Sequence, residues 1–168
     1  GTVSFTAPTA TYGGGELSGS LAYYIMVGND TLVSGSTQPG ALVNETVDVP
    51  EGLTTFRVTT ANAVGSSPES KVKVYVGNDE PTQVQDIRLH IDQETGDAIL
   101  MWSPVTTGIH SGYVGDVTYN VVRYPDSVTV ATGLTDAEFG ETLPSDKALQ
   151  TYSYGVIAVN GTQTSKEN

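Results

Sequence analysis

The sequence contains no cysteine, a single tryptophan and only 7 lysine and arginine residues among its 168 positions. The absence of cysteine excludes a disulfide framework, a thiol nucleophile and any cysteine-ligated metal. No apolar run approaches the roughly 20 residues that a bilayer-spanning helix requires, so we expect no membrane insertion within this chain.

Positive charge is scarce, since 19 acidic residues leave a formal net charge of −12. Proteins that bind nucleic acid depend on lysine and arginine to neutralise phosphates, and anionic lipid surfaces attract the same side chains. Neither nucleic acid nor a membrane surface is therefore expected as a partner.

What the sequence has in abundance is β-branched and turn-forming residues: 23 threonines, 21 valines, 19 glycines and 8 prolines. Threonine and valine suit a pleated, half-buried surface, and glycine and proline supply the turns that many short strands need. The length allows one large domain or two small ones. Together these features predict an all-β chain.

Three segments recur in the same order at offsets of about 96 to 98 residues, which indicates a duplicated module. In each pair the apolar and aromatic positions alternate in the same way, as a strand with one buried face requires. The pairs are Val3–Pro8 with Leu100–Pro104, Leu21–Val27 with Val117–Arg123, and Phe56–Asn62 with Tyr154–Asn160.

The boundary between the copies is predicted at the turn-rich segment Asn78-Asp79-Glu80-Pro81. This gives a first domain at 1–77, a linker at 78–81 and a second domain at 82–168. Strands are predicted near 2–7, 20–27, 31–34, 41–48, 53–62, 69–76, 84–92, 97–103, 117–124, 127–131, 136–143 and 151–160. Asp146–Leu149 is the one segment that suggests a helical turn.

Trp102-x-Pro104, Tyr119-x-Val121-x-Arg123 and the alternating run from Tyr152 to Asn160 resemble the fibronectin type III domain. The resemblance implies two immunoglobulin-like antiparallel β-sandwiches in tandem, with the tryptophan and the penultimate-strand tyrosine anchoring the core of the second. The linker and the loop Gly108–Tyr113 also resemble modules of large secreted or surface proteins of gut bacteria. That likeness implies an extracellular or cell-surface location.

Both copies depart from this family. The first begins directly at the second strand of the pattern, so Val3–Ala7 is expected to have an unpaired edge. We expect that edge to pair with another copy of the chain or to lie beside an upstream segment. Thr54 stands where the second copy has Tyr152, and the last strand of the second copy is reduced to the stub Thr162–Lys166.

His110 and Tyr113 form the candidate binding residues, because loops at the ends of sandwiches often carry binding. Two interpretations remain open: contact with a sugar or a peptide, or an ordered turn with a packed tyrosine. His90 alternates with apolar neighbours and is expected to face solvent. Asp92–Asp97 is interpreted as an exposed turn rather than a cation site, and Asp79 and Glu80 have only their charge to suggest a shared cation.

No catalytic constellation is found in the sequence: it has no Gly-x-Ser-x-Gly elbow, no zinc-binding histidine pair and no phosphate-binding glycine loop. We therefore expect no catalytic residues, no cofactor, no metal and no enzyme activity. The leading hypothesis is a spacer and interaction or adhesion surface within a larger exported bacterial protein, with a protein or polysaccharide as partner. The alternatives are a carbohydrate- or protein-binding module and accessory domains of a secreted enzyme.

Overall fold

The computed structural model describes residues 1–143 and 150–168 and divides the chain into two compact units, Gly1–Gly77 and Asn78–Asn168. Within the described residues the regular structure consists of β-strands, and every strand pairing is antiparallel. The all-β fold class, two antiparallel β-sandwiches in tandem, is confirmed. The helical turn suggested at Asp146–Leu149 lies outside the described residues.

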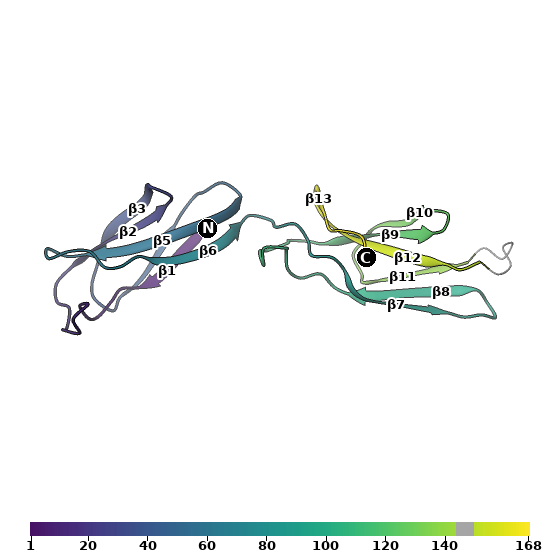
Figure 1. The fold of residues 1–168 in the computed structure, drawn as a ribbon, viewed down its shortest axis with the longest axis horizontal. Helices are drawn as coiled ribbons and strands as arrows, with labels where there is room; N and C mark the ends of the chain where they lie inside the picture. The colour runs from purple at the N-terminus through teal and green to yellow at the C-terminus, as the bar shows by residue number, and fades with distance from the viewer. Residues whose placement is uncertain (144–149) are drawn as a thin grey trace. The chain divides into compact units, whose positions relative to one another are not determined.

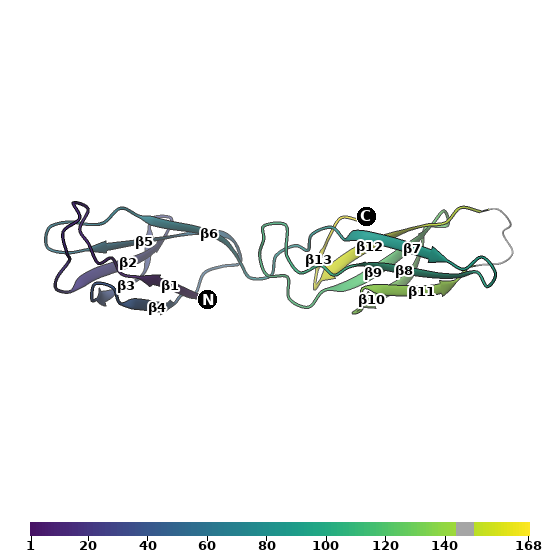
Figure 2. The same ribbon diagram turned by 90° about the horizontal axis from the view of Figure 1, so that it is seen from below.

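The first unit packs a two-stranded sheet against a four-stranded sheet (Figures 1 and 2). The small sheet has the order β1-β4 and the large one the order β3-β2-β5-β6. The strands are β1 (Thr2–Thr6), β2 (Leu21–Val27), β3 (Asp30–Thr37), β4 (Leu42–Thr46), β5 (Gly52–Ala61) and β6 (Ser70–Val76).

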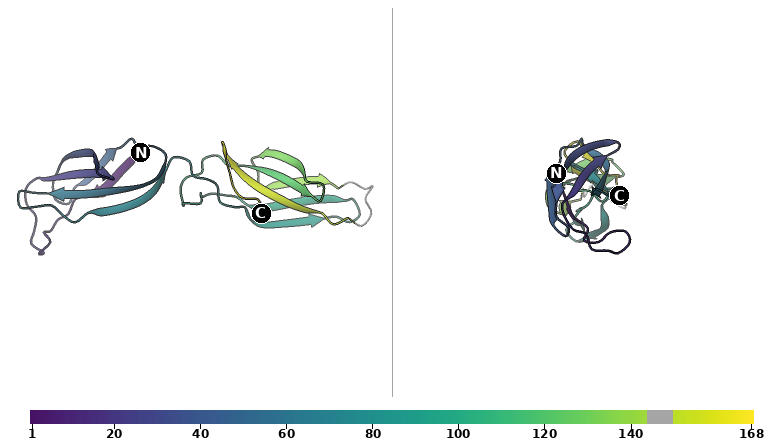
Figure 3. Two further views of the ribbon diagram at one scale, coloured as in Figure 1. Left: turned by 45° about the horizontal axis from the view of Figure 1, so that its top comes forward. Right: turned by 90° about the vertical axis from the view of Figure 1, so that its left-hand side faces the viewer.

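The second unit packs a three-stranded sheet of order β11-β8-β7 against a four-stranded sheet of order β10-β9-β12-β13 (Figure 3). The strands are β7 (Gln85–Ile91), β8 (Asp97–Ser103), β9 (Thr118–Tyr124), β10 (Val128–Leu134), β11 (Glu138–Thr142), β12 (Ser153–Asn160) and β13 (Gln163–Thr164). The predicted strands are confirmed, with ends that shift by a few residues.

Each unit buries its own apolar core between its two sheets. The sequence pattern placed Tyr23 with Ile25, and Tyr119 with Val121, on inward faces, and all four side chains are buried. Each core also contains an edge-to-face contact between two aromatic rings. Phe5 meets Tyr23 edge-on with ring centroids 5.6 Å apart, and Trp102 meets Tyr119 in the same way at 5.2 Å.

The register of the central strands confirms the duplication. Ile25 of β2 lies opposite Val58 of β5, and Val121 of β9 lies opposite Val156 of β12. These are the residues that the sequence offsets of 96 and 98 pair with one another. The two units therefore repeat one arrangement of strands, and residues of one can be compared with those of the other.

The segment 78–81, which the sequence analysis treats as a linker, belongs to the second unit. Asp79 and Pro81 are fully buried there, and the backbone of Thr82 donates a hydrogen bond to the carbonyl of Thr107. These residues thus lie with the second unit at the position where the sequence predicts a linker, and a polar Asp-Glu-Pro sequence gives no sign that its aspartate is buried.

Candidate functional site

The predicted binding loop Gly108–Tyr113 is fastened to the start of the second unit by the buried carboxylate of Asp79. The Asp79 Oδ2 atom accepts hydrogen bonds from the backbone N–H groups of His110, at 2.8 Å, and Gly112, at 3.0 Å. The Asp79 Oδ1 atom lies 2.8 Å from Nδ1 of His110. We call Asp79, Gly108, His110 and Gly112 the Asp79 clasp.

The backbone N–H and carbonyl groups of Asp79 are also hydrogen-bonded. Its N–H donates to the carbonyl oxygen of Tyr113 at 2.7 Å, and its carbonyl accepts from the buried Asn160 side chain at 3.3 Å. Every polar group of a buried aspartate needs a partner of this kind, since an unpaired one costs free energy. Asp79 thus connects the first residues of the second unit to the loop Gly108–Tyr113 and to the end of β12.

The electrostatics of the Asp79 clasp favour an ionised carboxylate. Burial raises the pKa of Asp79, and the hydrogen bonds from the His110 side chain and from the backbone of His110 and Gly112 lower it further than burial raises it. The net result is a pKa below the ordinary aspartate range. Asp79 therefore acts as a charged acceptor at neutral pH, and its neighbours are arranged to satisfy that charge.

Gly108 is required by the close approach of this carboxylate. A Cβ atom at position 108 would lie 2.3 Å from the Cβ and Cγ atoms of Asp79, so no larger residue fits without displacing it. The Ile109 N–H also donates to the carbonyl of Glu80 at 2.9 Å, which ties the other side of the loop to the same segment. The loop is therefore an ordered turn.

The two residues predicted as binding candidates differ in environment. The His110 side chain is 40% exposed, and the Tyr113 side chain is 72% exposed. His110 is engaged by Asp79, whereas Tyr113 extends from the same loop, as does Ile109, which is 52% exposed. The structure thus brings His110 to Asp79 and leaves an exposed aromatic and aliphatic pair beside them. The binding role of these residues stays a prediction.

Other predicted features have structural roles. The Asp92 carboxylate accepts from the backbone N–H groups of Glu94 and Thr95, and Asp97 accepts from the Thr95 and Thr142 hydroxyls. These bonds close the turn between β7 and β8, as interpreted from the sequence. The hydrogen bonds from the Thr142 and Thr95 hydroxyls lower the pKa of Asp97. His90 is exposed on β7, as expected.

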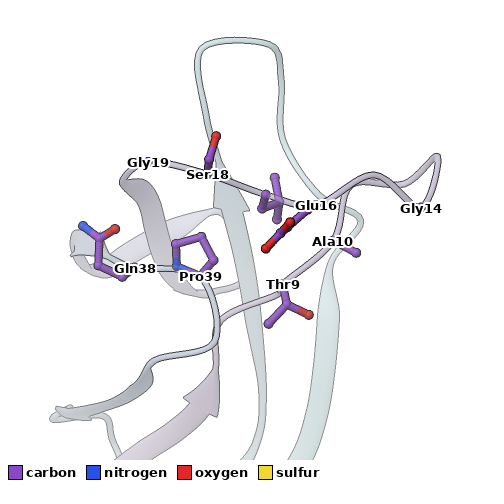
Figure 4. A pocket seen from close by; sticks show the side chains of 9 residues that line it. Thr9, Ala10, Gly14, Glu16, Ser18, Gly19, Gln38 and Pro39 are labelled. Atoms are coloured by element: carbon purple, nitrogen blue, oxygen red, sulfur yellow. The ribbon is translucent and has the colours of Figure 1, made fainter.

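Sequence analysis missed a polar hollow at one end of the first unit (Figure 4). Its volume is about 670 Å³, and it is lined by residues of the segment 9–19 together with Gln38 and Pro39. In Figure 4 the carboxylate of Glu16 lies between Thr9 and Pro39. A short hairpin that carries the fully exposed Tyr12 borders the hollow. No periodic signal marks such a loop in the sequence.

A charged network covers part of the second unit. Arg123 donates to Asp126 at 2.7 Å and to Glu141 at 2.5 Å, and the Tyr154 hydroxyl donates to the other Glu141 oxygen at 2.6 Å. The hydrogen bonds from Arg123 to Asp126 raise the pKa of Arg123, and burial raises that of Tyr154. This network joins β9, β11 and β12 and is structural.

Within residues 1–143 and 150–168, no group of three or more histidine, aspartate and glutamate side chains is placed to hold a metal ion. In the same part of the chain, no helix of the length and apolarity needed to cross a bilayer is found.

The chain was compared with known protein families, curated proteins and solved structures. No family model matches the sequence, and no curated protein matches it. The crystal structure of the chicken CNTN1 FN1-FN3 domains is similar at a TM-score of 0.46 and 12% sequence identity, over 92% of this chain and 56% of that one. The chain thus spans just over half of that structure. At this level the likeness says nothing about activity or partners, and the fold rests on the strand order given above.

Proposed function

We propose that the chain is a non-enzymatic tandem β-sandwich module of an exported bacterial protein, which serves as a spacer and as an interaction or adhesion surface. The observation that carries this proposal is the shortness of the connection between the units. β6 ends at Val76 in the first unit and Asp79 is already buried in the second, so only Gly77 and Asn78 intervene. Two extended residues reach about 7 Å.

Each unit is built as a self-contained bead. Both units have their own core, and their sheets are closed by antiparallel pairing within the unit. A short connection between two such beads restricts their relative motion far more than a long flexible linker does. We expect this property in a spacer that holds other domains of a larger parent protein apart.

Charge and resemblance support the rest of the proposal. The net charge of −12 favours solubility and disfavours nucleic acid and anionic lipid as partners. The likeness of the sequence to modules of secreted and surface proteins of gut bacteria supports an extracellular or cell-surface location. A protein or a polysaccharide is the expected partner of the interaction surface.

Small-angle X-ray scattering tests the spacer role. The proposal expects an elongated pair-distance distribution for the full chain, which broadens when six glycine and serine residues are inserted between Gly77 and Asn78. The control carries the same insertion between Gly13 and Gly14, in an exposed hairpin, and keeps the parent distribution. A compact distribution for the parent, or one that the insertion at Gly77 leaves unchanged, contradicts the spacer role.

A second candidate function is carbohydrate or peptide binding by the loop Gly108–Tyr113. The observation in its favour is that Tyr113 and Ile109 are exposed on a loop that the Asp79 clasp holds in one conformation, which reduces the entropy cost of binding. A glycan array probed with the parent chain and with Tyr113→Ala tests it, and Tyr12→Ala is the matched control. Binding that Tyr113→Ala leaves intact counts against this function.

A further inference from the structure

The arginine and lysine residues of the first unit are gathered on one surface. The unit contains three of them, Arg57, Lys71 and Lys73, against six acidic residues. Arg57 of β5 lies opposite Lys71 of β6, and Lys73 is two residues further along the same strand. Since successive side chains of a strand point to opposite faces, and Phe56 beside Arg57 is buried in the core, all three cations point to the outer face of the four-stranded sheet.

Two uncharged side chains lie beside these cations on the same face. Met26 of β2 is opposite Arg57 of β5, and Tyr24 is two residues before Met26 on the same strand. Both alternate with Tyr23 and Ile25, which are buried in the core. Tyr24 is 38% exposed, and neither Tyr24 nor Met26 belongs to the core cluster. We call this set of side chains the basic face: Tyr24, Met26, Arg57, Lys71 and Lys73.

One carboxylate orders part of the basic face. The Glu69 carboxylate lies 2.9 Å from Nη1 of Arg57 and 3.0 Å from Nζ of Lys71, and the hydrogen bond from Lys71 lowers the pKa of Glu69. The Arg57 side chain is only 23% exposed, whereas that of Lys71 is 59% exposed. Within the described residues Lys73 makes no ion pair. Glu69 therefore positions two cations and leaves an excess of positive charge on the face.

The second unit lacks these charges at the corresponding positions. The sequence offsets of 96 and 98 place Val122 where the first unit has Met26, and Gly155 where it has Arg57. The register agrees, since Gly155 lies opposite Val122 as Arg57 lies opposite Met26. A Cβ atom at position 155 would overlap the carboxylate of Glu167, so an acidic side chain covers this place in the second unit. The shared sandwich fold therefore does not require the basic face.

We propose that the basic face is a docking surface for an acidic patch on a separate protein. Tyr24, Met26 and Arg57 lie on the two central strands of the sheet, and tyrosine, methionine and arginine are enriched at the centre of protein interfaces. Lys71 and Lys73 lie on the edge strand and form a charged rim, which aspartate and glutamate of the partner complement. The proposal rests on the proposed function only for the premise that the chain is an interaction module.

The net charge of the chain is compatible with this attraction. Most of the negative charge belongs to the second unit, which has 13 acidic and 4 basic residues against 6 and 3 in the first. At physiological ionic strength the Debye length is about 8 Å, so distant carboxylates are screened while Lys71 and Lys73 act on a partner in contact. A symmetric pair of copies would place two basic faces together, and like charges repel. A partner of opposite charge therefore fits better than a second copy.

A synthetic peptide composed of glutamate, tyrosine and glycine is the probe, titrated into the full-length, ¹⁵N-labelled chain. The expected result is saturable binding that weakens as the salt concentration rises, with the largest amide shifts in β2, β5 and β6. The same peptide with glutamine in place of every glutamate is the control and does not bind. The double variant Lys71→Gln, Lys73→Gln is expected to weaken binding at least about tenfold. Lys166→Gln, at an exposed lysine of the second unit, leaves binding unchanged.

The uncharged centre of the basic face is tested separately with Tyr24→Ser, which is expected to weaken binding about fivefold. Tyr12→Ser, at a position that is 98% exposed on another part of the unit, is the control and leaves binding unchanged.

Absence of peptide binding, binding that either the double lysine variant or Tyr24→Ser leaves intact, or shifts confined to the second unit overturns the proposal. Binding of dextran sulfate in place of the peptide also overturns it, since the occupant would then be an anionic polysaccharide. A concentration-dependent dimer of the parent chain that the double lysine variant abolishes does the same, since the occupant would then be a second copy. These outcomes leave the scattering profile of the chain unaffected, so this proposal and the spacer role can fail separately.

Discussion

In the second unit β8 lies between β7 and β11, whereas its counterpart β1 in the first unit pairs with β4 alone. Within the described residues, the β1-β4 sheet thus has two strands where the β11-β8-β7 sheet has three. The comparison separates what the central strands supply from what the first strand adds. The aromatic pair and the central register are present in both units, so they do not depend on the first strand.

What the first strand adds is cover for the edge of the core. Val84 of the second unit is fully buried, while Val72 and Val74 of the first unit stay exposed on an inward face. Within the described residues, the first unit therefore leaves part of the inward face of β6 exposed.

The largest expected effect on stability is that of removing the aromatic rings of Trp102 and Phe5. Trp102→Ala should lower the free energy of unfolding of the second unit by about 3 to 5 kcal/mol, because it removes a large buried ring. Phe5→Ala should cost less in the first unit, since Phe5 is only half-buried. Urea unfolding followed by NMR measures both. If the units are independent, Phe5→Ala leaves the fluorescence transition of Trp102, the single tryptophan, in place.

The next effect compares the two valine positions directly. Val84→Ala should destabilise the second unit by about 2 to 3 kcal/mol, because it leaves a cavity at a fully buried site. Val74→Ala should change the first unit by less than about 0.5 kcal/mol. Urea titrations of both variants make the measurement. Equal costs at the two positions would show that β6 is covered in solution.

Acid sensitivity should differ between the units. The pKa of Asp79 is lower in the folded than in the unfolded chain. Its contribution to the free energy of unfolding of the second unit is therefore present above about pH 4 and is lost as the pH falls through the pKa of the folded state. Asp79→Asn should cost the second unit about 1 to 2 kcal/mol at neutral pH and remove this part of the acid dependence. Urea titrations at several pH values measure it. Asp116→Asn, at an exposed carboxylate, is the control that keeps the parent profile.

The smallest effect concerns the paired tyrosines. The Tyr119 hydroxyl accepts a hydrogen bond from the Val105 N–H at 2.9 Å, and Tyr119→Phe should cost about 1 kcal/mol because that partly buried donor loses its acceptor. The Tyr23 hydroxyl instead donates to Glu45, which retains access to water. Tyr23→Phe should therefore cost less than Tyr119→Phe in matched urea titrations. The reverse order would contradict the correspondence between the two cores.

The fold could be predicted from the sequence because the alternation of buried and exposed residues is a local pattern that occurs in both units. Alternation at Tyr23 and Ile25, and again at Tyr119 and Val121, predicts which faces are buried, and the recurrence at nearly constant offset predicts the duplication.

The candidate site was less accessible. His110 and Tyr113 were identified from a glycine-bounded loop, but Asp79, which positions that loop, was assigned to a linker. Its burial depends on contacts with residues about 30 positions away, and composition does not encode them. Tyr152 stands where the first copy has Thr54, and its buried hydroxyl has no hydrogen-bond partner within the described residues. Side-chain partners of this kind are set by tertiary packing.

Hydrogen exchange of individual backbone amides tests the difference between the two units most directly. In β1 the amides of Val3 and Phe5 face β4 and should exchange slowly, while those of Ser4 and Thr6 should exchange rapidly. In β8 the amides from Ala98 to Met101 are paired on both sides and should all exchange slowly. Uniform protection along β1 would contradict the account, because it would mean that the outer edge of the first unit is already covered.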